Sequence, residues 1–349
     1  MAHKMNLHTN KPPIKSALSN KKVNTKGIKK KLEGPFFKGA QSQWMKYSFR
    51  KIKNKPLNSL LIPGTHNSFA KSLKSEKSPK KAKINKIFKG YPKKLIRLIL
   101  SQWKETQTNG PVEQLMDGVR YFDLKICQDS SEFSKIRKLK ICNSLYAGIL
   151  EKSLQGLANF VKFVGKKEVL IINFREFTSV DEKSHQYLFN TLQSKFGKLL
   201  ADSNKLSPKS KFKDFIRLNQ RVIILYGNSD TVSNSKGLLW SSDVIRSPSF
   251  KVQDSISLYS KIKAQLAERS KTDEKLFITP AFITPNIQMI IKGLLSQPTC
   301  LQQQSSQVNP TIVNWISSNN LPISKMNVIL LNHESKHLLS ALIVKNLEH

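Results

Sequence analysis

Ile62-Pro63-Gly64-Thr65-His66-Asn67-Ser68 is the most informative stretch of this 349-residue chain. It follows the apolar run Leu57–Ile62, which predicts a strand that ends in a tight turn, because Pro, Gly and Asn favour turns. A histidine presented by a turn after a strand suits an active site at the carboxyl end of a barrel strand.

Two further segments predict strands that end in charged residues. Residues 114–125 read Gln-Leu-Met-Asp-Gly-Val-Arg-Tyr-Phe-Asp-Leu-Lys and end in Asp123 and Lys125. Residues 168–176 read Glu-Val-Leu-Ile-Ile-Asn-Phe-Arg-Glu and end in Arg175 and Glu176. Charged residues at the carboxyl ends of apolar strands fit the mouth of an α/β barrel.

These three segments, in this order, resemble the catalytic X domain of phosphatidylinositol-specific phospholipase C and of related X-domain-containing proteins. The resemblance spans roughly residues 42 to 346 and implies a TIM-type (β/α)8 barrel, a phospholipase C-like phosphodiesterase fold, with about eight mostly parallel strands. Residues 1–41 are rich in Lys, Asn, Ser and Pro and predict a basic, disordered tail. The segments that continue the resemblance are 221–226, Trp240, Leu276 with 283–285, Trp315 and 327–330.

Composition agrees with one large domain, since 39% of the residues are hydrophobic. The odd cysteine count, Cys127, Cys142 and Cys300, favours free thiols, although one bridge between the strand-like runs around Cys127 and Cys142 stays open. No apolar run is long enough to span a membrane and no secretory signal is visible. A cytoplasmic or peripheral membrane protein is therefore expected, and export without a cleaved signal stays open.

The charge is strongly basic, with 59 Lys or Arg against 23 acidic residues and a net charge of +36. The first 100 residues hold 26 of the basic residues and two of the acidic ones. An anionic partner should therefore meet the amino-terminal third. Lipid headgroups, nucleic acid and phosphorylated metabolites all fit, and a merely solvated basic face is the ordinary alternative.

The basic stretch 71–103 predicts an amphipathic insertion. Lys71–Lys83 reads as a lysine-rich loop, and residues 84–103 place apolar residues at helical spacing on both sides of 90–92, which predicts two short helices. Such helices lie on an anionic bilayer or pack onto the barrel. The pattern favours packing for 95–103 and a membrane for 80–89, and some bacterial members of the resembled family carry an interfacial helix after the first catalytic histidine.

The resemblance implies phosphodiester cleavage in which one histidine acts as base and a second as acid. His66 matches the base, but Asn143 stands in the place of the acid. An amide cannot give up a proton at neutral pH, so acid catalysis should fall by about 10² to 10⁴.

The family's metal-independent members also place an aspartate that orients the first histidine, and here Asn332 occupies its aligned position. Neighbouring His333, Glu334 and His337 are candidate replacements. An ordinary place on the surface of a helix is the simpler interpretation of His337, and of His185 as well.

Calcium-dependent members of the family use oxygen ligands, for which Asn67 and Asp123 would fit. Lys125 and Arg175 stand where two acidic ligands would be needed, so calcium independence and no cofactor are expected. We interpret both cations as phosphate clamps and Asp123 as their orienter or an inositol contact, with salt bridges to Asp123 and Glu176 as the alternative. Tyr226 is either an inositol-stacking residue or a core-edge tyrosine.

Together these features predict a metal-independent phosphoric diester hydrolase that cleaves a phosphoinositide or related lipid to diacylglycerol and inositol phosphate at an anionic membrane surface. One alternative is a catalytically dead barrel that binds phosphoinositides. The other is a nucleic-acid-binding protein, for which the sequence offers charge but no recognition motif. No obligate protein partner is predicted.

Overall fold

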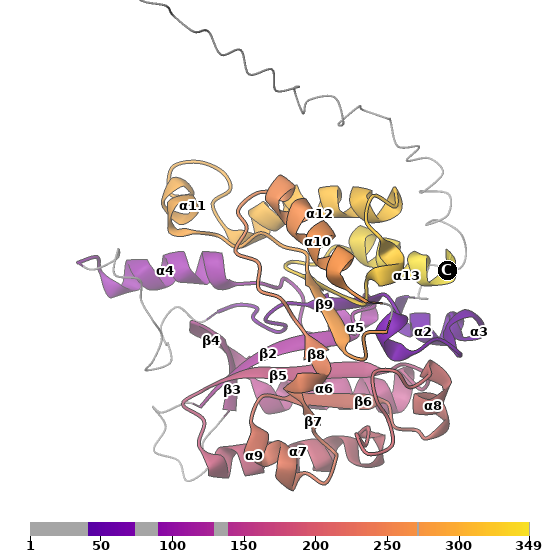
Figure 1. Cartoon of the computed structure of the whole chain (residues 1–349). Coiled ribbons are helices and arrows are strands. Elements are labelled where there is room, and N and C mark those ends of the chain that lie inside the picture. The colour runs from indigo at the N-terminus through magenta and orange to yellow at the C-terminus, as the bar shows by residue number, and fades with distance from the viewer. Residues whose placement is uncertain (1–40, 74–89, 129–138, 271, 349) are drawn as a thin grey trace, which may run out of the picture. The chain divides into compact units, whose positions relative to one another are not determined.

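The computed structural model describes residues 41–73, 90–128, 139–270 and 272–348. Its centre is a curled sheet of parallel strands, shown in Figure 1. Among the described residues no pairing joins the first and last strands of this order, so the barrel stays open at that seam. In spatial order the strands are β7 (Trp240–Ser241), β6 (Val222–Tyr226), β5 (Leu170–Thr178), β2 (Tyr121–Gln128), β1 (Ile62–Thr65), β10 (Val328–Leu331), β9 (Leu276–Pro280) and β8 (Ile245–Arg246).

The chain reaches these strands in sequential order, with helices in the connections, and this confirms the predicted α/β barrel. An antiparallel hairpin, β3 (Leu139–Asn143) and β4 (Leu145–Ile149), extends the sheet beside β2. In the first half of the barrel, α2 (Trp44–Tyr47) and α3 (Phe49–Ile52) precede β1, α4 (Lys93–Lys104) and α5 (Pro111–Met116) precede β2, and α6 (Leu150–Asn159) precedes β5. Next, α7 (Glu182–Phe196) and α8 (Phe212–Arg217) precede β6, and α9 (Ser229–Asn234) precedes β7. Finally, α10 (Ser255–Glu268) precedes β9, α11 (Ile287–Lys292) and α12 (Leu301–Ser317) precede β10, and α13 (Lys336–Glu348) follows β10.

Alternation along each strand separates the barrel interior from the layer beneath the helices. On β6, Ile223 and Leu225 belong to one buried apolar cluster, and Val222, Ile224 and Tyr226 to the other. Successive side chains of a strand point to opposite faces, so the first cluster fills the barrel and the second packs against helices.

The interior changes character along β2. Tyr121 lies in the apolar interior cluster. Asp123 and Lys125 follow at alternate positions toward the carboxyl end, so their side chains point to the same face of the strand. On β5, Ile171 is followed in the same way by Asn173 and Arg175. The carboxyl end of the barrel is therefore the polar end, as the sequence predicted.

Two predicted strand boundaries are wrong. The run Leu57–Ile62 forms a 3-10 turn at Leu57–Ser59, and β1 begins only at Ile62. The strand itself contains Pro63 and Gly64, residues that strands usually lack, which hid it in the sequence. The segment predicted as a strand from residue 114 first completes helix α5, and β2 begins at Tyr121.

Cys127 and Cys142 form a disulfide between β2 and β3, with their Cα atoms 6.0 Å apart. The favoured expectation of free thiols is therefore wrong for this pair, and the bridge left open is the correct alternative. The reason is the antiparallel pairing of β2 with β3, which brings the two cysteines close together although they are 15 residues apart in the sequence. Cys300 remains a free thiol.

The predicted amphipathic stretch is partly described. Its second helix is α4, which buries Ile96, Ile99 and Trp103 against Ile290 of α11. Packing onto the protein is thus confirmed for this face, whereas Leu95 is 42% exposed. The tail 1–40 and residues 74–89, with most of the predicted lysine-rich loop and first helix, lie outside the described residues.

A buried ion pair closes the amino-terminal end of the barrel. Arg120 and Glu168 are both fully buried, and Nη2 of Arg120 lies 2.8 Å from Oε2 of Glu168. Arg120 also donates to the carbonyls of Leu115 and Ser42, while Glu168 accepts from the amide of Lys46. The pair therefore satisfies backbone groups from α5 and the α2 region, and each charge depends on the other.

Replacing Glu168 by Gln should lower the free energy of unfolding by about 3–5 kcal/mol, because it leaves the Arg120 guanidinium buried without a counter-charge. Urea unfolding measures the change. The matched control is Glu274→Gln, which breaks the exposed pair with Lys209 and should cost less than about 1 kcal/mol. Equal effects of the two substitutions would contradict the assigned role of the buried pair.

Candidate active site

The turn after β1 is built by its own side chains. The hydroxyl of Ser68 donates to the carbonyl of Thr65 at 2.6 Å, and the amide of Ser68 donates to the carbonyl of Asp123 at 2.7 Å. The amide of Asp123 donates back to the Ser68 hydroxyl at 2.7 Å. These bonds fix the turn against the middle of β2. Asn67 adopts a φ of 40°, a left-handed conformation that Asn tolerates well.

Gly64 allows β1 to lie between its neighbours at close range. A Cβ at this position would meet side-chain atoms of Tyr121 and Val328 at 3.1 Å. That distance is tighter than ordinary packing, so a larger residue would push β1 away from β2 and β10. The glycine of the Pro-Gly-Thr-His stretch thus serves to place the histidine.

His66 lies at the carboxyl end of β1, where its ring stacks on Phe282 with centroids 4.4 Å apart. Its Nδ1 lies 3.0 Å from Oδ1 of Asn332, which follows β10. Asn332 therefore sits at the place that the sequence alignment assigned to it. Because the amide oxygen accepts hydrogen bonds, this contact favours a proton on Nδ1 and leaves Nε2 with its lone pair.

Burial lowers the pKa of His66 to about 4, opposed by the negative charge of Asp123 and assisted by Arg175 and Lys125. The imidazole is therefore neutral at pH 7 and able to accept a proton. Asn332 supplies a hydrogen bond but no charge, so nothing behind the ring stabilises an imidazolium in the way a carboxylate would.

Asp123, Arg175 and Asn67 form one polar cluster beside the histidine. Nε of Arg175 lies 2.8 Å from Oδ1 of Asp123, and its Nη2 donates to Oδ1 of Asn67 at 3.2 Å. Asp123 is buried, whereas the Arg175 side chain is 38% exposed. The guanidinium thus occupies the two oxygens that a divalent ion would need, and it keeps an open side for an anion.

Lys125 pairs with Glu176 at 3.1 Å, with both side chains partly exposed. The pairing of β2 with β5 shifts register between Leu124 and Lys125, which sets Glu176 opposite Lys125 and leaves Arg175 to reach back to Asp123. The salt bridges that the sequence offered as the alternative are therefore both present. Neither excludes a phosphate, because both cations retain exposed surface.

Asn143 ends β3 and is only 7% exposed. Its amide nitrogen donates to the carbonyl of Lys104 at 2.6 Å, so it satisfies one of the last carbonyls of helix α4. The side chain at the place of the family's acid therefore holds a helix end in position, with one of its two N–H groups donated to that helix.

The segment that follows α4 fastens the histidine turn and was not predicted to do so. Thr106 donates to the carbonyl of Asn67 at 3.0 Å, and Gln107 donates to the carbonyl of His66 at 2.8 Å. Both residues are buried. These contacts join a loop to a turn about 40 residues earlier in the sequence, so no local sequence pattern predicts them.

His333 belongs to the same scaffold. Its Nε2 lies 2.7 Å from the carbonyl of Glu105 and its Nδ1 lies 2.9 Å from the hydroxyl of Thr108. Burial lowers its pKa to about 4, so the ring is a neutral bridge between two loops. Burial raises the pKa of Glu334 to about 7, and His337 is exposed on α13 as expected.

Two sequence interpretations are corrected here. Tyr226 is 1% exposed and its hydroxyl lies 2.8 Å from Nδ1 of His185, so it belongs to the layer beneath α7 and cannot stack on a sugar at the barrel mouth. The same contact shows that His185 is a buried residue of α7. Tyr226 points to the same face of β6 as Ile224, and this face is turned away from the barrel interior.

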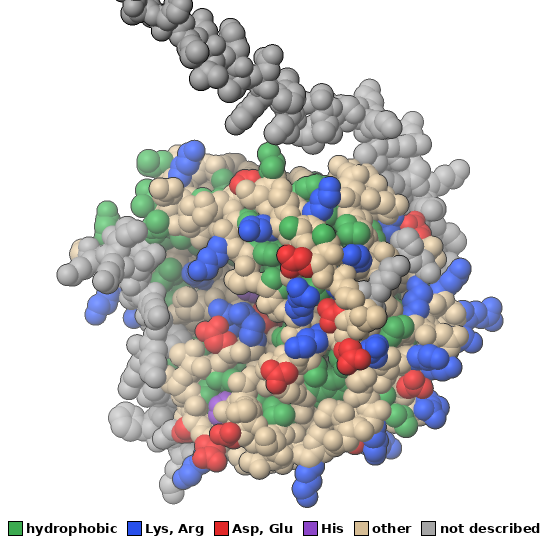
Figure 2. Space-filling model, in the orientation of Figure 1, with side chains coloured by type: hydrophobic (Ala, Val, Ile, Leu, Met, Phe, Trp, Pro, Cys, Tyr) green, Lys and Arg blue, Asp and Glu red, His purple; other side chains and the backbone are tan. Residues whose placement is uncertain are grey.

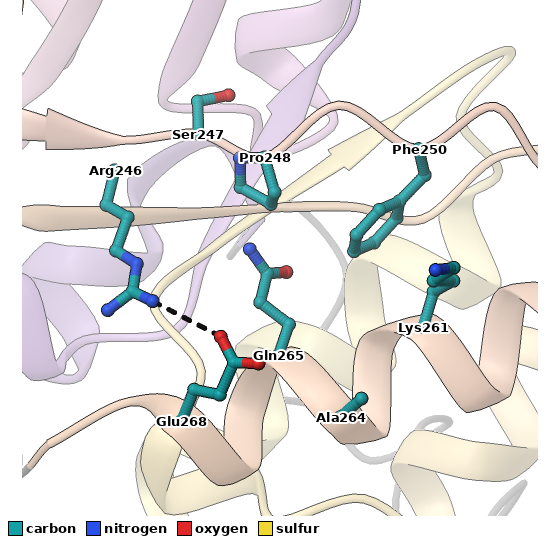
Figure 3. A pocket seen from close by; sticks show the side chains of 8 residues that line it. All are labelled: Arg246, Ser247, Pro248, Phe250, Lys261, Ala264, Gln265 and Glu268. Atoms are coloured by element: carbon teal, nitrogen blue, oxygen red, sulfur yellow. Dashed lines mark hydrogen bonds and ion pairs between the residues drawn. The ribbon is translucent and has the colours of Figure 1, made fainter.

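A cavity of about 360 Å³ lies elsewhere, between the exit of β8 and helix α10 (Figure 3). Arg246 and Glu268 face each other across its edge, and Gln265 points into it. None of its lining residues belongs to the cluster around His66, so the cavity is separate from the candidate active site.

Comparison with known proteins agrees with this geometry. No family model matches the chain. PI-PLC X domain-containing protein 3 of Mus musculus is 24% identical over 299 residues, which cover 82% of this chain and 88% of that protein. PI-PLC X domain-containing protein 2 of Homo sapiens is 26% identical over 262 residues, covering 73% and 81%. Over most of its length the chain is therefore similar to PI-PLC X domain-containing proteins.

The fold is similar to that of solved phospholipases. A phosphatidylinositol-specific phospholipase C from Listeria monocytogenes superposes with a TM-score of 0.58 at 18% identity, covering 88% of this chain and 98% of the other. One from Staphylococcus aureus superposes with a TM-score of 0.60 at 13% identity, covering 86% and 97%. At these identities the likeness concerns the barrel, and the chemistry rests on the side chains described above.

Replacing Asn332 by Asp should raise the pKa of His66 from about 4 by roughly 1–3 units, because a carboxylate 3.0 Å from Nδ1 stabilises the imidazolium. Titration of the histidine ring signals by NMR measures this shift. Asn190→Asp, which adds the same charge on the exposed face of α7, is the matched control and should leave His66 unchanged. An unmoved His66 signal in Asn332→Asp would show that the two side chains do not interact.

Proposed function

We propose that this protein is a metal-independent phosphoric diester hydrolase that cleaves a phosphoinositide or related lipid at an anionic membrane surface. The observation that carries the proposal is a neutral His66 held beside the cluster of Arg175, Asp123 and Asn67 at the carboxyl end of the barrel. This combination offers a base and a fixed cation within one site, which are the two requirements of attack on a phosphodiester.

In the proposed reaction His66 takes the proton of the inositol hydroxyl next to the phosphate. Arg175 and Lys125 bind the phosphoryl oxygens, whose negative charge increases as the hydroxyl oxygen attacks. Asp123 keeps the Arg175 guanidinium in place through the 2.8 Å contact. The products are diacylglycerol and an inositol phosphate, which is cyclic if the attacking oxygen is the neighbouring hydroxyl.

Independence from calcium is part of the proposal. A divalent ion in this place would need the oxygens of Asn67 and Asp123, and both accept hydrogen bonds from Arg175. Binding of calcium would therefore require the guanidinium to leave, at the cost of a charge-assisted hydrogen bond to a buried carboxylate. Turnover in the presence of chelator follows from this arrangement.

A surface for lipid lies beside the site. We call it the apolar rim and define it by the exposed side chains of Tyr91, Leu95 and Leu98 around α4 and of Ile291, Leu294 and Leu295 around α11. Leu295 is 92% exposed. Figure 2 shows hydrophobic side chains, with basic ones among them, on the side of the molecule where Figure 1 places these two helices.

The composition of the apolar rim fits an interface with anionic lipid. Lys93, Lys94 and Lys292 lie exposed among its apolar residues. Aliphatic side chains can enter the headgroup layer while neighbouring lysines bind phosphate. The helices that carry the rim are joined to the site, since α4 ends two residues before Thr106 and α11 follows Phe282, which stacks on His66. None of the described helices is long and apolar enough to cross a bilayer.

A second candidate function is a barrel that binds phosphoinositides without cleaving them. The observation that favours it is the bond from Asn143 to the carbonyl of Lys104, because the side chain at the acid's place thereby caps the end of a helix. Such a protein would keep the phosphate-binding cluster and the apolar rim and lack turnover.

Release of water-soluble inositol phosphate from phosphatidylinositol vesicles, in the presence of chelator, distinguishes the two functions. The hydrolase reading predicts turnover that falls by about 10² to 10⁴ in His66→Ala, because the base is lost. His337→Ala, on the exposed face of α13, is the matched control and should keep full activity. Absence of turnover in the native chain, with activity gained in Asn143→His, would instead support the binding barrel.

Replacing Leu95 and Leu98 together by Asp should weaken binding to vesicles that contain anionic lipid by about tenfold or more per residue, since each exposed leucine no longer enters the headgroup layer. Sedimentation with vesicles measures the effect. Phe163→Asp is the control, because Phe163 is 74% exposed in the short π-helix Phe160–Val164 that follows α6 and precedes the amino-terminal end of β5. Equal binding by all three proteins would exclude the apolar rim as the docking surface.

A further inference from the structure

The proposed hydrolase needs a proton donor for the departing lipid oxygen, and Asn143 cannot serve. Its amide gives up no proton at neutral pH, and its nitrogen is 2.6 Å from the carbonyl of Lys104. That contact places Lys104 next to Asn143. Lys104 is the last residue of α4, and its carbonyl lies against the Asn143 side chain at the end of β3.

Hydrogen bonds hold the backbone at and directly after Lys104. Asn143 holds its carbonyl, and the carbonyl of the next residue, Glu105, lies 2.7 Å from Nε2 of His333. One residue later, Thr106 bonds to the carbonyl of Asn67 in the histidine turn. The end of α4 is therefore part of the rigid edge of the site and not a free helix terminus.

Lys104 also lies near the phosphate-binding cations. β3 pairs antiparallel with β2, with Ile141 opposite Ile126, which brings the end of β3 alongside Lys125. Lys125 lowers the pKa of both Lys104 and His66, so its charge is a neighbour to each of them. The Lys125 ammonium is therefore a charged neighbour that His66 and Lys104 share, beside the proposed phosphate position.

The surroundings of Lys104 suit a proton donor. Its side chain is half-buried, and burial together with the charge of Lys125 lowers its pKa from the ordinary value for lysine. A lysine so placed releases its proton more readily than an exposed one. No ion pair or hydrogen bond of its Nζ is found among the described residues, so the ammonium is not committed to a carboxylate there.

We propose that Lys104 is the proton donor to the diacylglycerol oxygen, in the place where the family's acid would stand. This inference rests on the proposed function and adds a residue to it. His66 takes the proton of the inositol hydroxyl, the hydroxyl oxygen bonds to phosphorus, and the bond from phosphorus to the diacylglycerol oxygen breaks. That oxygen receives one proton from the Lys104 ammonium. The step leaves His66 as imidazolium and Lys104 as neutral amine, and proton exchange with water restores both.

The test compares two substrates that differ in their need for an acid. Phosphatidylinositol releases an alkoxide that must be protonated, whereas the p-nitrophenyl ester of inositol phosphate releases a phenolate that is stable without a proton. Lys104→Met should therefore lower kcat on the lipid by about 10² to 10⁴ and change kcat on the p-nitrophenyl ester by less than about tenfold. His66→Ala should lower both, because the base acts on both substrates.

Lys104→Arg separates proton donation from charge. Arginine keeps the positive charge but does not release a proton in proteins, so this variant should be as slow on the lipid as Lys104→Met. Lys213→Met, on the exposed face of α8, is the matched control and should keep both activities. Thermal unfolding and vesicle sedimentation of each variant establish that it is folded and docked.

Each outcome decides between the claims. Full lipid turnover by Lys104→Met or by Lys104→Arg would overturn the assignment of Lys104 while the proposed hydrolase stands. An equal loss on both substrates would also overturn it, because it would indicate a role in binding. A native chain that is inactive on both substrates would overturn the proposed function itself and this inference with it.

Discussion

The two hydrogen bonds between Ser68 and Asp123 are the constraint on which the site depends. One joins the Ser68 amide to the Asp123 carbonyl and the other joins the Asp123 amide to the Ser68 hydroxyl, so the turn that carries His66 is fixed to the middle of β2 beside Asp123. Arg175 then bonds to both Asp123 and Asn67, which connects β5 to the same turn and strand. The base and the cation are therefore positioned by strands of the barrel and not by mobile loops, which favours a preorganised site.

Burial and the charges around His66 determine how readily this histidine accepts a proton. Cations and burial hold the pKa of His66 near 4, so the imidazole is available as a base but has little driving force to take a proton. Asn332 adds no charge that would raise it. In the proposed reaction the attack would then be assisted mainly by stabilising the phosphoryl charge, which is the role proposed for Arg175 and Lys125. A cationic site with a weak base is thus internally consistent for an anionic substrate.

Features that depend on residues close together in the sequence could be predicted, whereas contacts between distant segments could not. Asp123 and Arg175 were identifiable because long strands with period-two alternation place them inside the barrel at its carboxyl end. For Tyr226 the sequence left inositol stacking and a place at the edge of the core open, and only the structure shows that the side chain points outward onto His185. The bond from Asn143 to the end of α4 spans 39 residues and depends on how a hairpin packs, so no pattern in the sequence contains it.

The connection from β1 to β2 unites functions that the sequence presents as separate. It begins with the turn of His66, continues into α4 with its half of the apolar rim, and returns through Thr106 and Gln107, which bond to the turn where it began. Lys104 lies at the junction of these parts. A displacement of α4 must therefore strain the bonds that hold His66, because the segment between them is only two residues long and buried at both contacts. The proposed lipid docking on α4 and the proposed proton transfer at the barrel mouth would therefore depend on the same set of hydrogen bonds.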